Sequence, residues 1–521
     1  GKNPYGKGKF NLNPISELHV MKSYQESKND SHQSSIWYDS IGLGKSPMIG
    51  GDPHTCYEHP TQHYVDMLNH VAFDPYGTGK DDHVACIGMQ VTDPKNKRIG
   101  KDNDSLVLYA AKLTNGNNII NPTRYDSGNH DYFSAVNQQW EAANILAITA
   151  GDYDGDGKDT VVFYEAGRSR RLIHEEGVNG NQWSWGGTVV DLNSELTNAT
   201  SYFDSENKDL VKRSMTLVQM VSGDVDRDGK DELIVLAGWG NIKDNNNSKK
   251  FVDRAFHIFI FKKIDNKWQK IFCQKLQYDD GTNNIMMRYA GAAIGDINGD
   301  NMPEIVIGGY KTVVNKGATE WQHGDNDVAK DKFLIKVIRY NTKTKTFDYG
   351  DDAFLEVNSN ELIKDGMYTD KNMAMQSPVS IECVALNGYG QPKDVFLEGT
   401  IYKGTYLTGT EGNYPYTPHT QAVNGIGGAI INNVYIEDVV VGNFDGNTYG
   451  REQVMYSTVY HHQSTTRYYF RLNSIGLNSD GTFYHASDDN IGMNNRTMDE
   501  NMYVSIAAVD ADDDGTIGYY E

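Results

Sequence analysis

Short apolar runs recur along the chain, and the clearest of them end at a glycine. Some precede an acidic stretch, at 145–151 (ILAITAG), 217–223 (LVQMVSG) and 289–295 (YAGAAIG). Others follow it, at 160–167 (TVVFYEAG), 232–238 (ELIVLAG) and 304–309 (EIVIGG). Runs of this length, rich in β-branched residues, are typical of strands, and sustained helical periodicity is hard to find. The pattern predicts strand–loop–strand units in an all-β protein.

The acidic stretch between the runs repeats with a loose period of about 73 residues. It reads GDYDGDGKD from Gly151, GDVDRDGKD from Gly223 and GDINGDNMPE from Gly295. GNFDGNTYGRE and VDADDDG continue the series from Gly442 and Val509. With two weaker copies, the first acidic or amide residues are Asp74, Asp152, Asp224, Asp296, Asn387, Asn443 and Asp510.

A second hairpin follows several copies, at 254–278, 332–350 and 466–487, where alternating strands flank a polar turn. Four strands in each of seven units predict a seven-bladed β-propeller of four-stranded antiparallel blades. The acidic loop joins the first and second strands of each blade. We divide the chain into an N-terminal segment, 1–60, and the propeller, 61–521.

The last copy leaves room for about two strands before the sequence ends, and a propeller left incomplete would expose sheet edges. Runs at 16–24 (SELHVMKSY) and 34–41 (SSIWYDSI) are expected to complete the seventh blade. The alternative is a cut parent chain that originally continued.

Alternating carboxylates in a tight loop suit calcium, which takes six to eight oxygen ligands. An EF-hand is excluded, because it needs a helix on each side and an acid at position 12, whereas two copies carry the acid at position 9. For a single copy, a solvated Asx turn is the alternative. The predicted ligands are Asp152, Asp154, Asp156, Asp224, Asp226, Asp228, Glu232, Asp296, Asn298, Asp300, Glu304, Asn443, Asp445, Asn447, Glu452, Asp510, Asp512 and Asp514.

Not every copy has a complete set of ligands. Thr160 stands at the ninth position of the first clear copy, Gly518 stands there in the last, and an insertion displaces the acid to Glu452. The copies at Asp74 and Asn387 keep too few carboxylates and are predicted to be metal-free turns. We therefore expect about four to five calcium ions.

The motif resembles the FG-GAP or VCBS repeat of integrin α-subunit propellers and bacterial secreted proteins, roughly from Tyr64 to the end. The resemblance implies a seven-bladed propeller with calcium in the loops and a binding or adhesive role.

Composition limits the partners and the compartment. The formal net charge is −22, from 48 basic and 70 acidic residues, and no basic patch suits a nucleic acid. No apolar run of 18 residues exists, so no membrane insertion is expected. Calcium loops favour an extracellular protein, secreted or on the cell surface.

No catalytic residue can be assigned from the sequence. His59 and His63 have helical spacing, but Pro60 separates them and no HExxH frame is present. No GxSxG elbow occurs either. An enzyme is less favoured than a binding module, although a polysaccharide lyase is the first alternative. A rigid scaffold of a larger surface protein is another.

Long aromatic stretches from Gly238, Gly309 and Thr400 are interpreted as connections between second and third strands, at the end of the disc away from calcium. Exposed aromatic rings there suit a glycan or a cell-surface protein. The oligomeric state is left open. The candidate contact residues are Trp239, Tyr310, Trp321, Tyr402, Tyr406 and Tyr414.

Overall fold

A computed structural model gives the arrangement of the strands. It describes residues 18–23, 36–41, 64–91, 105–112, 119–125, 147–166, 171–199, 216–239, 255–315, 328–349, 354–358, 378–409, 412, 415–416, 431–444, 450–462, 468–488, 506–509 and 518–520. Nearly all of the regular structure in these ranges is strand, which confirms the all-β class. Among the described residues, no helix is long and apolar enough to cross a membrane.

In the first half of the chain, strands that follow one another in the sequence pair in antiparallel groups of four. Strands β3 (Tyr64–Phe73), β4 (His83–Val91), β5 (Ser105–Lys112) and β6 (Ile119–Tyr125) come first. They are followed by β7 (Ile148–Gly151), β8 (Thr160–Ala166), β9 (Arg171–Asn179) and β10 (Gln182–Asp191), and then by helix α2 (Leu192–Ala199). Strand β10 joins β6 in parallel, so these two groups share one sheet. The next sheet contains β11 (Thr216–Gly223), β12 (Glu232–Trp239), β13 (His257–Ile264) and β14 (Lys267–Lys275).

The following sheets continue this order. One contains β15 (Gln277–Asp279), β16 (Asn283–Gly295), β17 (Glu304–Asn315), β18 (Val328–Asn341), β19 (Thr346–Asp348) and β20 (Leu355–Asn358). The next contains β21 (Ile381–Val384), β22 (Asp394–Leu397), β23 (Thr400–Tyr402) and β24 (Pro415–Tyr416), with helix α5 (Gly404–Leu407) after β23. Then come β25 (Ile431–Gly442), β26 (Gln453–His462), β27 (Tyr468–Leu477) and β28 (Phe483–Asp488).

The last sheet combines strands from both ends of the sequence. Strands β29 (Ala507–Val509) and β30 (Gly518–Tyr520) pair with each other, and β30 pairs with β1 (Leu18–Ser23). Strand β2 (Ile36–Ile41) adds the outer edge, which gives the order β2-β1-β30-β29. The N-terminal strands therefore complete the sheet that the last two strands begin.

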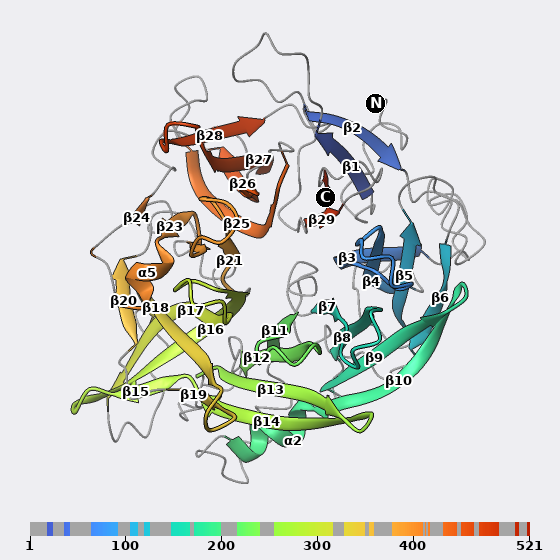
Figure 1. The fold of residues 1–521 in the computed structure, drawn as a ribbon, viewed down its shortest axis with the longest axis horizontal. Coiled ribbons are helices and arrows are strands. Elements are labelled where there is room, and N and C mark those ends of the chain that lie inside the picture. Colours follow the sequence, from blue (N-terminus) through green and yellow to red (C-terminus); the bar gives the residue numbers. More distant parts are fainter. Residues whose placement is uncertain are drawn as a thin grey trace.

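The sheets stand around a common centre, which gives the molecule a propeller-like shape (Figure 1). The strand that precedes each acidic loop, or the equivalent loop, contacts the corresponding strand of the next group, in the order β3, β7, β11, β16, β21, β25 and β29. Strand β29 then contacts β3, so the ring of inner strands is closed.

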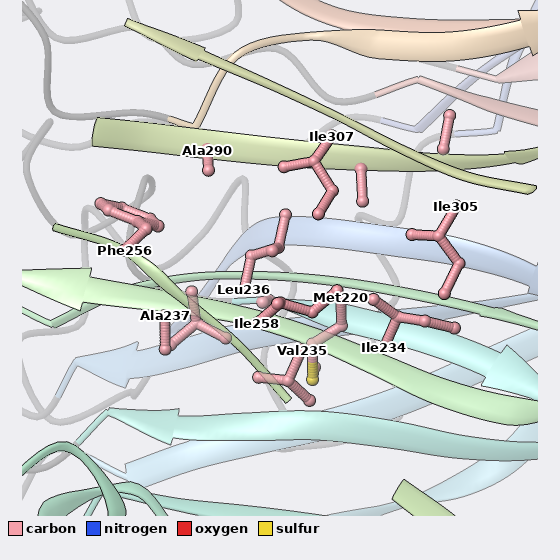
Figure 2. Packing of buried hydrophobic residues seen from close by; sticks show 14 of the residues in the cluster. Met220, Ile234, Val235, Leu236, Ala237, Phe256, Ile258, Ala290, Ile305 and Ile307 are labelled. Carbon is pink, nitrogen blue, oxygen red and sulfur yellow. The ribbon is translucent and has the colours of Figure 1, made fainter. Parts of the chain in front are cut away.

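The continuous apolar run of β12 follows from its place in the middle of its sheet. Residues Leu233 to Ala237 are all buried, on both faces of the strand. Figure 2 shows Ile234 and Leu236 of β12 facing Ile305 and Ile307 of β17 across the space between two sheets. A strand covered on both faces needs apolar residues without alternation, which explains the sequence ELIVLAG.

The turn between β13 and β14 determines the geometry of the outer hairpin of this sheet. Asp265 and Asn266 both have positive φ, 49° and 58°. Two such residues between paired strands form the tight turn that matches strand twist, and Asp and Asn tolerate this conformation. The hairpins expected at 254–278, 332–350 and 466–487 are confirmed as β13–β14, β18–β19 and β27–β28.

Candidate functional site

The acidic loops connect the first and second strands of successive sheets. The loop of Asp152 joins β7 to β8, that of Asp224 joins β11 to β12, and that of Asp296 joins β16 to β17. Strands flank each loop, so the strand–loop–strand prediction is confirmed and the exclusion of the EF-hand holds for these loops.

These three loops share one backbone conformation. In each loop the second carboxylate oxygen of the first aspartate accepts a hydrogen bond from the amide five residues ahead, which is Gly157 (2.9 Å), Gly229 (2.9 Å) or Asn301 (2.8 Å). Positions 4 and 6 have positive φ in each loop, and position 6 is Gly157, Gly229 and Asn301. Glycine and asparagine adopt this conformation at low cost, so the loop turns back on its own carboxylates.

The carboxylates converge in two of the loops. One ligand oxygen each of Asp152, Asp154 and Asp156 lies within 4.8 Å of the others, and so do those of Asp224, Asp226 and Glu232. Oxygens on opposite sides of a calcium ion with bonds of about 2.4 Å are about 4.8 Å apart. The donor sets therefore fit a hard divalent cation in spacing and in chemistry.

The ninth loop position closes the loop through a hydrogen bond to the second residue. Glu232 accepts from the Val225 amide and Glu304 from the Ile297 amide, both at 3.0 Å. Burial raises the pKa of each carboxyl group to about 7. In the Asp296 loop, the Asn298 side-chain amide also donates to Glu304 Oε1.

In the Asn443 loop, the structure differs from the prediction for one ligand, Glu452. Gln453, not Glu452, accepts from the second loop residue, Phe444 (2.7 Å), and so takes the place of Glu232. Glu452 instead accepts from the Ala385 amide of the neighbouring sheet (2.7 Å). This loop is two residues longer than the Asp224 loop, so Gln453 stands at the ninth position and Glu452 at the eighth, where the Asp224 loop has Asp231. The structure therefore does not place Glu452 at the ligand position predicted for it. Asn443 is half-buried at the end of β25, and Asp445 and Asn447 lie outside the described residues.

The sequence analysis did not assign a role to the residue at position 8, which links three pairs of neighbouring loops. Asp231, at position 8, accepts from the Asp152 amide, while its own amide donates to the Asp152 carbonyl, both at 2.9 Å. Asp159 makes the same two contacts with Asp74, both at 2.8 Å. Glu452 and Ala385 form a third such pair, with the main-chain bond at 3.0 Å. We call this reciprocal contact the inter-loop clamp.

The glycine before the acidic loop makes room for the next sheet. A Cβ on Gly151 would lie 2.7 Å from Asp231 Oδ2, and a Cβ on Gly295 would lie 2.6 Å from the Cβ of Cys383. The recurrent pair Gly–Asp in the motif therefore serves contact between sheets as well as the loop itself. The repeated acid at position 8 was the sequence signal for the clamp.

The loop near Asn387 starts two residues earlier than the sequence predicts. Ala385 occupies the place of Asp152, because Glu452 holds its amide as Asp231 holds that of Asp152. Asn387 is therefore its third residue, and Gly388 and Gly390 supply the positive φ at positions 4 and 6. In the Asp74 loop, the carboxylate accepts hydrogen bonds from Tyr76, Thr78, Gly79 and Lys80 of its own loop. Both remain predicted metal-free turns, and Asp510, Asp512 and Asp514 lie outside the described residues.

The structure contradicts the predicted exposure of two of the aromatic residues. Tyr310 is 2% and Tyr402 3% exposed, because they lie within β17 and β23 and pack in the core. The stretch from Thr400 is not a connection between second and third strands, since the tight turn of Glu398 and Gly399 already joins β22 to β23.

Tyr406 lies on α5, which follows β23 and so returns to the end of the acidic loops. A Cβ on Gly404 of this helix would lie 2.4 Å from the carbonyl of Ile297 in the Asp296 loop. The expected position of Tyr406 at the opposite end is therefore wrong. Trp239 ends β12, and Trp321 and Tyr414 lie outside the described residues.

A cavity of about 420 Å³ lies among the inner strands. Polar side chains from several strands line it, among them His70, Gln219, Glu382 and Asp438. Burial raises the pKa of Glu382 to about 8, and the nearby Asp438 carboxylate raises it too. Asp438 Oδ2 accepts from the Ile506 amide (2.7 Å), which ties β25 to the segment leading into β29. The cavity thus places a carboxyl group of raised pKa near a second acid.

Comparison with known proteins leaves the family open. No protein-family model matches the chain, and no curated protein matches it. The FG-GAP resemblance therefore stays a hypothesis.

Several solved structures resemble the fold at low identity. An α-L-arabinofuranosidase from Fusarium graminearum is 10% identical, over 81% of this chain and 92% of that one, with a TM-score of 0.36. A rhamnogalacturonan lyase from Bacillus licheniformis is 13% identical, over 87% and 84%, with a TM-score of 0.32. A subtype N11 neuraminidase-like protein from a flat-faced bat isolate is 8% identical, over 82% and 88%, with a TM-score of 0.31. At such low identities and TM-scores, these similarities carry no argument about activity.

Proposed function

We propose that the chain is a seven-bladed, calcium-stabilised β-propeller that serves as an extracellular binding or adhesion module for a glycan or a cell-surface protein. The observation that carries the proposal is the convergence of carboxylate oxygens in the Asp152 and Asp224 loops. The closed ring of inner strands and the contacts between adjacent loops support it, because cations at these loops would brace one end of the ring.

In this proposal calcium acts through rigidity, and the partner binds at the other end of the ring. The connections after β12 and β17 emerge there, since the acidic loops precede both strands. Trp239 is the last residue of β12 and Trp321 belongs to the connection after β17, and aromatic rings are suited to sugar faces and to protein contacts. Calcium itself would supply only charge neutralisation and fixed loop geometry.

Two measurements test the proposal separately. Calcium that binds only the folded state raises the melting temperature, so excess EDTA should lower it and added calcium should restore it. Metal analysis without calcium, together with a melting curve that EDTA leaves unmoved, would refute the metal part. A glycan array on the calcium-loaded protein tests the partner, and the Trp239→Ala/Trp321→Ala double variant should lose binding while keeping its calcium and its melting temperature. Retention of binding in that variant would refute the proposed face.

The second candidate is a carbohydrate-active enzyme with its site in the central cavity. Glu382 and Asp438 favour it, because a protonated carboxyl group near a carboxylate is a usual acid–base arrangement. Release of reducing or unsaturated ends from polysaccharide pools, absent in Glu382→Gln, would support this candidate over the binding module.

A further inference from the structure

Lys262 places an ammonium group among the carboxylates of the Asp224 loop. Its Nζ lies 2.6 Å from Asp226 Oδ2, 2.9 Å from Asp228 Oδ2 and 2.6 Å from Glu232 Oε1. The lysine is 9% exposed, and Glu232 is fully buried. Three donors on one ammonium meet three separate acceptors, which is the full hydrogen-bonding capacity of the group.

The strand register explains why a lysine reaches this loop. Leu233 pairs with Phe261, so the ninth loop residue, Glu232, faces Lys262 on the third strand of the sheet. A side chain at this cross-strand position points to the same face as its partner. The register of the sheet therefore directs the Lys262 side chain toward the loop carboxylates.

The same third-strand position differs in the other loops. Val161 pairs with Glu176, so Thr160 of the Asp152 loop faces Gly177, which has no side chain. The basic group that contacts the described carboxylates of that loop is the exposed Lys158, at 3.2 Å from Asp156.

In the Asp296 loop, Ile305 pairs with Ile338, so Glu304 faces Arg339. Arg339 Nε lies 3.4 Å from Glu304 Oε1, and its side chain is 45% exposed. This guanidinium contacts one carboxylate, whereas the Lys262 ammonium contacts three of the four predicted ligands of its own loop.

We propose that Lys262 is a built-in cation of the Asp224 loop and competes with calcium for the same carboxylates. The ammonium neutralises charge that a divalent cation would otherwise have to neutralise, and a cation entering among these oxygens must displace it. Of the loops with converging carboxylates, the Asp224 loop then binds calcium less tightly and the Asp152 loop more tightly. The inference rests on the proposed calcium loops.

The test compares calcium binding by the wild type, Lys262→Met and Gly177→Lys, using equilibrium dialysis and metal analysis, with melting curves in EDTA. Lys262→Met removes the ammonium, and the exposed Lys267→Met on the same hairpin is its matched control. Gly177→Lys supplies an ammonium to the Asp152 loop. A Cβ there meets its nearest atom, Thr160 Cγ2, at 3.6 Å, so a side chain can begin at this position without a close contact.

We expect Lys262→Met to gain one calcium ion, or to bind one on the order of tenfold more tightly, because a like charge is removed. Its melting temperature should fall in EDTA, where the carboxylates repel one another, and recover with calcium. Gly177→Lys should lose one ion, and Lys267→Met should match the wild type.

The other outcomes separate the two proposals. If the wild type binds calcium and Lys262→Met has the same stoichiometry and affinities, the Lys262 inference fails and the calcium loops stand. If only Lys262→Met binds calcium, the inference holds and the metal part of the proposed function fails for the wild type. If none of the proteins binds calcium, both fail. If Lys262→Met does not fold, a folded Gly177→Lys with unchanged calcium binding overturns the inference and one with a lost ion supports it.

Discussion

The inter-loop clamp can be tested at Asp231 with two substitutions that differ in one property. Asp231→Ala removes the acceptor of the Asp152 amide hydrogen bond, which is 2.9 Å long, but leaves the main-chain bond in the opposite direction. Asp231→Asn keeps a side-chain oxygen in reach of the same amide and removes the charge. The pair therefore isolates the hydrogen bond from the carboxylate charge.

The expected magnitudes follow from burial and charge. A buried amide left without an acceptor costs about 1–3 kcal/mol, and since Asp152 is half-buried we expect about 1–2 kcal/mol of lost stability for Asp231→Ala. Burial raises the pKa of Asp231, so the ionised form is disfavoured in the folded protein. The neutral Asp231→Asn should therefore be close to the wild type or slightly more stable at neutral pH.

The assay is guanidinium unfolding in EDTA, so that metal binding does not contribute, combined with hydrogen exchange. The midpoint should fall for Asp231→Ala alone, at an unchanged slope. Amide exchange in a peptide spanning 148–156 should speed up in Asp231→Ala and stay slow in Asp231→Asn. Equal stabilities and equal exchange for the two variants would refute the clamp, because the hydrogen bond is what distinguishes them.

Three further changes have defined outcomes. Gly295→Ala should lower the melting temperature, as its Cβ would overlap Cys383 at a cost of about 1–3 kcal/mol, whereas Gly177→Ala should not, and similar curves for both would contradict the close approach. The pKa of Glu382 is raised from 4.5 to about 8, so its favourable contribution is complete below pH 4.5 and is lost as pH rises through 8. Glu382→Gln should therefore equal the wild type at pH 4 and exceed it at pH 9 by on the order of 1–3 kcal/mol after allowance for solvent screening, and a pH-independent difference would count against this. Deleting residues 1–45 removes β1 and β2 and should give insoluble protein, so a soluble truncation with an unchanged melting curve would show that the last sheet does not need them.

The local pattern was enough to predict the strands and loops but not the contacts between sheets. The acidic loops, their flanking strands and the outer hairpins follow from composition and spacing, since each is a property of neighbouring residues. The role of Asp231 depends on a loop 79 positions away. In the Asn443 loop, Gln453 takes the ninth position and Glu452 contacts the neighbouring sheet, which the spacing of the acidic residues did not predict.

The misplaced aromatic residues have a similar cause. Turn residues Glu398 and Gly399 reverse the chain within two positions, so Tyr402 becomes a buried strand residue and Tyr406 emerges at the opposite end from the one expected. Tyr310 is buried because β17 extends as far as Asn315, well beyond the apolar run EIVIGG. A strand that continues through polar residues by pairing with its neighbours leaves no signal in hydrophobic periodicity.

The pairing of Val20 with Tyr520 has a consequence for how the molecule reaches its folded state during synthesis. Strand β1 leaves the ribosome long before its partner β30, which is made about five hundred residues later. We expect β1 and β2 to stay unpaired with β30 while the intervening sheets fold in order. The folding of these sheets brings the two ends of the chain together. Closure is then the last step, and it needs little further search, because a nearly complete ring already holds the two ends close together. Until that step the nascent chain presents two unpaired sheet edges, and this interval is when the protein is most exposed to pairing with another copy of itself.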